Sequence, residues 1–153
     1  MKKILVDATS LLLRSAGIKN YTYHWLRALQ ASAPGRFDAY PFMGDLGTLN
    51  HNGSNLSMFA TLPRIAALQL FNRVLTKGLD RITAPYGLFH VSNQVKCPPV
   101  KTPVTATIHD LTCWLLPETH TAANRAADQV FADRVLKVRG MLETLRTTGQ
   151  LGT

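Results

Sequence analysis

A histidine and an aspartate, His109 and Asp110, stand side by side at the end of the apolar run Val104–Ile108. The run is typical of a short strand buried in a parallel sheet, so both side chains would emerge at the edge where such folds bind ligands. Both groups are polar and titratable, and the loops at this edge are where such folds place their chemistry. The alternative is a histidine that bonds a loop carbonyl beside an aspartate that caps a turn. The position favours chemistry, and we predict that His109 and Asp110 are catalytic.

A second group of candidates opens the first helical pattern after a short loop. Its members are Gly17, Ile18, Lys19, Asn20 and Tyr21. A helix N-terminus presents unpaired N–H groups and a partial positive charge, which suit a phosphate or an oxyanion. Gly17 would let a ligand approach the backbone closely, although it could equally serve only a tight turn. The GxGxxG and GxxxxGK[ST] fingerprints are absent, which argues against a dinucleotide-binding dehydrogenase or a P-loop enzyme.

The strand pattern Leu88–Ser92 ends in a polar residue, Asn93, that we predict to form part of a pocket wall. Its histidine, His90, is predicted to pack within the sheet. The remaining histidines are His24, His51 and His120. They show no metal-ligand spacing, so the sequence predicts no metal site and no bound cofactor.

The elements that position these residues follow from the apolar patterning. Strands are predicted at Lys3–Ala8, Phe37–Met43, Leu56–Ala60 (weakly), Leu88–Ser92 and Val104–Ile108. Helices are predicted from Ile18 to Leu29, from Pro63 to about Leu79, and from Thr121 or Ala122 to at least Lys137. A mobile, Gly- and Asn-rich loop is predicted over 44–55. This alternation predicts an α/β fold, a three-layer Rossmann-like open parallel sheet with helices on both faces.

Composition narrows the class of protein. The chain has 153 residues, enough for one domain, and its formal net charge of +8 favours anionic partners. Cys97 and Cys113 lack CxxC spacing and are expected to be reduced thiols. Because no apolar stretch is long enough to cross a bilayer and no proper signal peptide is present, we expect a cytoplasmic protein. Peripheral association with the inner face of the membrane stays open.

Four segments carry a resemblance to a known family. The segments KILVDAT, GIKNYTYHWLRAL, FHVSN and VTATIHDLTCWLLPETH resemble the N-terminal domain of retaining glycosyltransferases of family 4, which have the GT-B fold. The resemblance covers Met1 to about Lys137, and TIHDL…PE is its most specific part. Family members often carry a second glycine where Lys19 stands here.

The resemblance implies a two-domain enzyme with its active site in the cleft between the halves. The N-terminal half would supply the acceptor side, and the C-terminal half would grip the nucleotide-sugar, which is a substrate rather than a cofactor. The residue matching His109 would contact the donor sugar, and the helix opening at Gly17 together with Asn93 would bind donor or acceptor. On this reading residues 1–140 form the acceptor-side domain, residues 141–153 a helix extension and flexible tail, and the chain alone is catalytically incomplete.

Non-catalytic readings stay open beside this one. The chain could be a binding or partner module that self-associates as a homo-oligomer or pairs with a separate donor-binding half. It could also bind an anionic membrane surface through Arg73, Lys77 and Arg81, which lie one turn apart on the predicted Arg64–Arg81 helix. Nothing resembles an RNA-binding sheet or a helix-turn-helix, so no nucleic-acid partner is expected.

Overall fold

The computed structural model describes residues 2–14, 17–75, 77–92, 94–109 and 115–137. The chain divides into two compact units, Met1–Thr107 and Ile108–Thr153, and each is described by itself. The first unit contains the sheet. The predicted tail over 141–153 lies outside the described residues.

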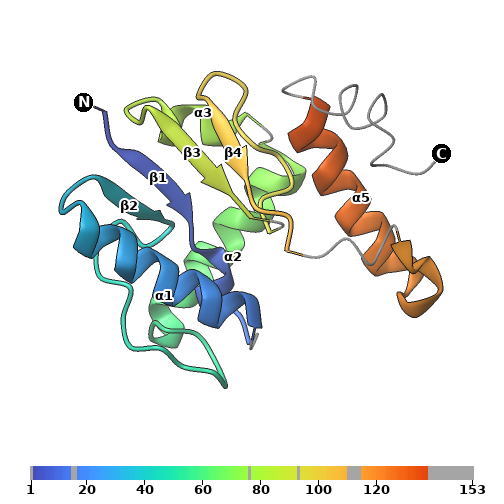
Figure 1. The fold of residues 1–153 in the computed structure, drawn as a ribbon, viewed down its shortest axis with the longest axis horizontal. Helices are drawn as coiled ribbons and strands as arrows, with labels where there is room; N and C mark the ends of the chain where they lie inside the picture. The colour runs from blue at the N-terminus through green and yellow to red at the C-terminus, as the bar shows by residue number, and fades with distance from the viewer. Residues whose placement is uncertain (1, 15–16, 76, 93, 110–114, 138–153) are drawn as a thin grey trace. The chain divides into compact units, whose positions relative to one another are not determined.

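Four short parallel strands form the sheet of the first unit (Figure 1). They are β1 (Ile4–Asp7), β2 (Phe37–Tyr40), β3 (Leu88–Val91) and β4 (Val104–Ala106), in the spatial order β2-β1-β3-β4. Val6 in β1 is in register with Ala39 of β2 and His90 of β3. The predicted α/β class with an open, all-parallel sheet is confirmed.

The helices of the first unit cover opposite faces of the sheet. Helix α1 (Gly17–Ser32) joins β1 to β2, whereas α2 (Met58–Arg73) and α3 (Gly78–Thr83) lie between β2 and β3. The two connections run in opposite directions across the sheet, and right-handed crossovers then place their helices on opposite faces. In Figure 1, α1 lies in front of the strands and α2 behind them. The topological switch point therefore falls between β1 and β3.

The core of the first unit is built on β1. Leu5 and Val6 are buried on the two faces of the strand, as expected for a parallel strand covered on both sides. Helix α1 contributes Leu26 to the cluster that contains Val6, with Trp25 packed against its margin. A short 3-10 helix, η1 (Thr9–Leu12), follows β1 directly and adds Leu11 and Leu12.

Two predicted elements between β2 and β3 are wrong. No strand forms at Leu56–Ala60, because α2 already begins at Met58 and Pro63 lies inside it. The helix predicted to run to Leu79 ends at Arg73, and α3 begins at Gly78. A Cβ at Gly78 would come within 2.5 Å of the Phe71 ring, so glycine is required where the chain turns back. Arg73, Lys77 and Arg81 therefore do not share one helix.

Strand β2 is shorter than predicted. It ends at Tyr40, three residues before the predicted end at Met43. Pro41 follows, and proline has no N–H to continue the ladder. The backbone then turns through Met43, which has a φ of 52°.

The second unit contains a short 3-10 helix, η2 (Pro117–Thr119), and helix α5 (Ala122–Lys137). The predicted start of this helix is confirmed. In α5, Phe131 and Ala132 are buried, whereas Ala126 and Val130 are exposed.

Candidate functional site

The carboxyl edge of the sheet, where β1 to β4 end, is organised around the buried carboxylate of Asp7. Asp7 is the last residue of β1 and is 2% exposed. Its Oδ1 accepts hydrogen bonds from the Thr9 backbone N–H at 2.9 Å and from Thr9 Oγ1 at 2.7 Å. Its Oδ2 accepts from the Ser92 N–H at 3.1 Å and from the Ser92 hydroxyl. Asp7 thus ties β1 to the end of β3 at the switch point.

Burial sets the electrostatics of this cluster. Loss of solvent raises the pKa of Asp7, although its hydrogen bonds with Ser92 and Thr9 favour the carboxylate. Burial, and then the nearby Asp7 charge, raise the pKa of Tyr40 to about 12. All four donors to Asp7 come from the protein, so this carboxylate serves structure at the centre of the edge. Asp7 was not among the predicted site residues; a carboxylate near the end of a buried apolar run was the available signal.

Ser10 lies in η1 at the same edge. Unlike the Ser92 hydroxyl, the Ser10 hydroxyl makes no hydrogen bond to Asp7 or to any other described residue. The Ser10 side chain is 3% exposed. A buried hydroxyl without a partner costs free energy, because it has lost water and gained nothing in return. The carboxyl edge thus contains one saturated buried polar cluster and one unsatisfied buried group.

The predicted glycine turn forms the N-terminus of α1. The helix begins at Gly17, which is exposed, and a Cβ placed there would meet no other atom within 4 Å. Asn20 and Tyr21 are also exposed, whereas Ile18 is half-buried. In the first turn of α1, Gly17 and Asn20 therefore face solvent, and a ligand has room to approach the backbone at Gly17.

Lys19 is buried, unlike the exposed Gly17 and Asn20 beside it. Its side chain is fully buried, and its Nζ donates to the Leu13 carbonyl at 3.0 Å and to the Gly53 carbonyl. Burial lowers the pKa of its ammonium group. Lys19 therefore links the start of α1 to the loop over 44–55, which was predicted to be mobile.

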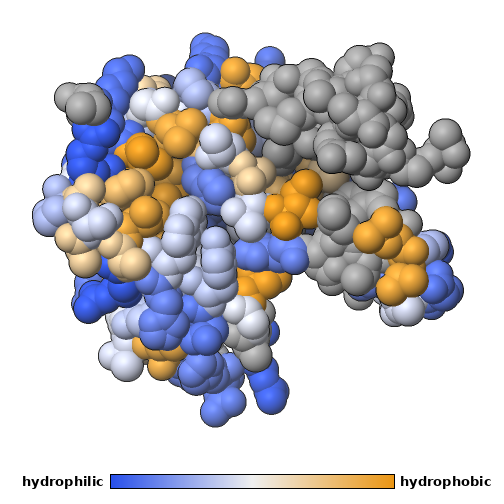
Figure 2. Space-filling model, viewed as in Figure 1, coloured by the Kyte–Doolittle hydropathy of each residue, from blue (hydrophilic) through white to orange (hydrophobic). Residues whose placement is uncertain are grey.

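Further contacts hold that loop. The Asn55 N–H donates to the Leu11 carbonyl at 2.9 Å, and the Asn55 side chain donates to the Leu46 carbonyl at 3.1 Å. Figure 2 shows a mainly hydrophilic surface over the N-terminal part of α1 and the loop beneath it.

His90 packs within the sheet, as predicted. Its Nδ1 lies 3.0 Å from Thr105 Oγ1, and its Nε2 lies 3.0 Å from Thr107 Oγ1. The Trp25 ring of α1 meets the imidazole edge-on, with 4.9 Å between ring centroids. Asn93, the predicted pocket-wall residue, lies outside the described residues.

His109 belongs to the second unit, and its side chain is exposed. Partial burial lowers the pKa of its imidazole, which favours the neutral form. Strand β4 ends at Ala106, before the predicted end at Ile108, and the Thr107 N–H still donates to the Val91 carbonyl at 3.3 Å. Asp110 lies outside the described residues. That His109 shares an edge with Gly17 stays a prediction.

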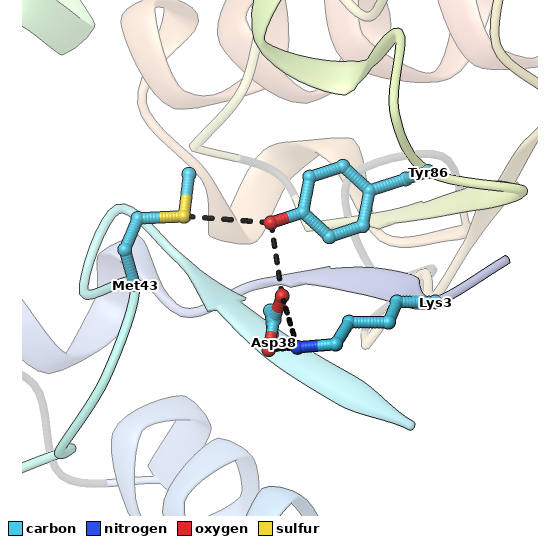
Figure 3. Close-up of polar contacts among 4 residues, drawn as sticks. All are labelled: Lys3, Asp38, Met43 and Tyr86. Atoms are coloured by element: carbon cyan, nitrogen blue, oxygen red, sulfur yellow. Dashed lines mark hydrogen bonds and ion pairs between the residues drawn. The ribbon is translucent and has the colours of Figure 1, made fainter. Parts of the chain in front are cut away.

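A separate polar cluster lies near the amino ends of the strands (Figure 3). Lys3 Nζ contacts the Asp38 carboxylate at 3.2 and 3.3 Å, and the Tyr86 hydroxyl donates to Asp38 Oδ2 at 3.0 Å. Met43 Sδ lies 3.8 Å from the same hydroxyl. Burial, and then Asp38, raise the pKa of Tyr86. Because Lys3 is half exposed, this pair is screened by solvent and joins strands without forming a site.

Within the described ranges, no group of three or more His, Cys, Asp or Glu residues could hold a metal ion. No helix of that same part of the chain is long and apolar enough to cross a membrane. Cys97 is buried, and its thiol donates to the Asn72 carbonyl at 3.3 Å; Cys113 lies outside the described residues.

Comparison of the chain with family models, with curated proteins and with solved structures gives no match in any of the three. The site is therefore interpreted from its own geometry and chemistry.

Proposed function

We propose that this chain is the acceptor-side half of a retaining glycosyltransferase, which moves a sugar from a nucleotide-sugar donor to an acceptor. The observation that carries the proposal is the start of α1, exposed at Gly17 and Asn20, at the carboxyl edge of an all-parallel sheet. In open α/β sheets this edge binds the ligand. The TIHDL…PE resemblance supplies the reaction class.

The chain length between β4 and His109 supports a role for this histidine at the same edge. β4 ends at Ala106, and three residues of extended chain span at most about 11 Å. The His109 Cα therefore lies within about 11 Å of the Ala106 Cα. A side chain this close to a strand end can serve a ligand bound beyond the sheet.

The proposed work of His109 is positioning and charge stabilisation. Its lowered pKa favours a neutral imidazole, which can donate one hydrogen bond and accept another. Held against the hydroxyl groups of the donor sugar, such a ring would orient the sugar as the bond to the nucleotide diphosphate lengthens. It would also stabilise the oxocarbenium-like transition state.

A second domain would hold the diphosphate of the donor. Without that clamp, the leaving-group charge is not stabilised and the donor is not oriented. We therefore expect the purified 153-residue chain to turn over no UDP- or GDP-sugar. Turnover by this chain alone, abolished by His109→Ala, would contradict its assignment as one half of the enzyme.

The direct test joins the chain to a donor-binding domain. We expect the same or the adjoining reading frame to encode one with a Glu-x7-Glu pair. The joined protein is assayed with UDP- and GDP-sugars, and the anomeric configuration of the product is read by NMR. We expect transfer with retention, and a loss of about a hundredfold or more in kcat/KM for His109→Ala.

The matched control is His24→Ala, which removes an exposed histidine from α1. It should keep wild-type activity. The proposal fails if no donor-binding domain is encoded nearby, if the joined protein transfers no sugar, or if His109→Ala is as active as the control.

A further inference from the structure

Helix α2 exposes a continuous apolar face. The residues of α2 that lie open to solvent are Met58, Phe59, Leu62, Pro63, Ala66, Gln69, Leu70 and Arg73, which we call the α2 stripe. Six of the eight are apolar, and none is acidic. Phe59 is 92% exposed and Met58 is 73% exposed. An apolar surface of this extent marks an interaction site, whereas scattered single residues would not.

The other face of α2 anchors the helix, so the stripe points outward. Thr61 and Leu68 are buried, and Ile65 packs against the core cluster that contains Val6. The Arg64 side chain also bonds within the protein, because its guanidinium donates to the Pro41 and Ala60 carbonyls. The packing of α2 therefore leaves the stripe without a role in the core.

Positive charge accompanies the stripe. Residues 46–79 contain no Asp or Glu; Arg73 is exposed as the last residue of α2, and Lys77 is exposed just before α3. Residues 1–107 contain twelve Lys and Arg against four Asp and Glu, whereas residues 108–153 contain five of each. The unit that carries α2 therefore holds the whole net charge of +8.

We propose that the α2 stripe docks on the surface of an anionic lipid bilayer. Met58, Phe59 and Leu62 enter the boundary between headgroups and acyl chains, and Arg73 and Lys77 contact the anionic headgroups. An apolar helix face with basic residues and no acidic ones suits this surface. The sixteen residues of α2 lie on the bilayer and do not cross it.

Charge and chemistry favour an anionic bilayer as the partner of the α2 stripe over a second copy of the chain or a nucleic acid. A second copy would bring the same positive unit against the first, and like charges repel. A nucleic acid would satisfy the cations, but it offers Met58 and Leu62 no apolar surface to enter. The inference stands independently of the proposed sugar transfer, because it uses no residue of the carboxyl edge.

The test measures co-sedimentation of the full chain with vesicles. We expect binding to vesicles of equal parts phosphatidylglycerol and phosphatidylcholine, and little binding to pure phosphatidylcholine. The double variant Phe59→Ser/Leu62→Ser should weaken the partition coefficient by about tenfold or more. Arg73→Gln/Lys77→Gln should weaken it by roughly tenfold, and added salt should reproduce that loss.

Matched controls come from other exposed positions of the same unit. Val100→Ser removes an exposed apolar side chain, and Arg27→Gln removes an exposed charge from α1. Both should bind vesicles like the wild type, and thermal unfolding should show that every variant is folded. The proposal is overturned if the Phe59→Ser/Leu62→Ser variant binds as the wild type does. It is also overturned if that variant only dissolves a lipid-free dimer, or if single-stranded RNA binds where anionic vesicles do not.

Discussion

The two edges of the sheet hold their aspartates in different ways. At the carboxyl edge, Asp7 is buried and accepts four hydrogen bonds from Thr9 and Ser92. Near the amino edge, Asp38 is partly exposed and contacts Lys3 and Tyr86. A buried charge must be saturated with donors to be tolerated, whereas an exposed pair is screened and contributes little. The carboxyl edge is therefore the more tightly organised of the two.

The same carboxyl edge also carries hydrogen-bonding groups that are not saturated by described residues. The first turn of α1 is open to solvent at Gly17, and the Ser10 hydroxyl has no partner within the part of the chain that the structure describes. A rigid, internally saturated centre beside an exposed helix start is what a ligand site on a scaffold needs. The contrast predicts effects of different sizes for substitutions at the two edges.

The largest effect is expected for Asp7→Ala. The substitution leaves the donors of Thr9 and Ser92 buried without their acceptor, and we expect a loss of about 3–5 kcal/mol in the free energy of unfolding. Asp38→Ala, its counterpart near the amino edge, should cost about 1 kcal/mol or less. Urea denaturation followed by circular dichroism measures both. Equal losses of unfolding free energy in Asp7→Ala and Asp38→Ala would contradict the difference drawn between the two edges.

A smaller difference in unfolding free energy is expected between alanine variants of two buried serines at the carboxyl edge. Ser92→Ala removes a donor to Asp7 and should cost about 1–2 kcal/mol. Ser10→Ala removes a hydroxyl without a described partner and should be neutral or stabilise by up to about 1 kcal/mol. The two alanine variants control for each other in the same denaturation experiment. A costly Ser10→Ala together with a neutral Ser92→Ala would reverse the roles assigned here.

The last prediction concerns the pH dependence of stability that Asp7 contributes. Burial raises the pKa of Asp7, so the folded state binds this proton more tightly than the unfolded state does. The resulting stabilisation is complete below the ordinary carboxyl pKa and is lost as the pH rises through the raised value. We expect the stability of the wild type relative to Asp7→Asn to fall with rising pH across that window. A difference that grows with pH would mean that the hydrogen bonds outweigh burial.

Much of the sheet could be predicted because strands buried on both faces leave a direct signal. The runs that became β1, β3 and β4 are short, apolar and followed by polar residues. The start of α2 was missed because Leu56–Ala60 is apolar enough to suggest a strand. Ser57, the residue just before the helix, belongs to a type favoured at helix N-caps and was the available signal.

The organisation of the carboxyl edge could not be predicted, because its partners are distant in sequence. Ser92 lies 85 residues from Asp7, and Gly53 lies 34 residues from Lys19. Periodicity also assigns a lysine to the exposed side of a helix, whereas Lys19 is fully buried between carbonyl groups. Local patterns indicate where polar residues follow strands, but not which of them bond one another.

The proposed function requires that His109 and the first turn of α1 serve one ligand at the carboxyl edge, which stays a prediction. A nitroxide attached at position 109 in His109→Cys/Cys113→Ser tests it by paramagnetic broadening of backbone amides; Cys97 is buried and shielded from the reagent. The account predicts stronger broadening at Gly17 and Ile18 than at Gly87, which precedes β3 at the amino edge. Stronger broadening at Gly87 than at Gly17 would place position 109 at the wrong edge and contradict the account.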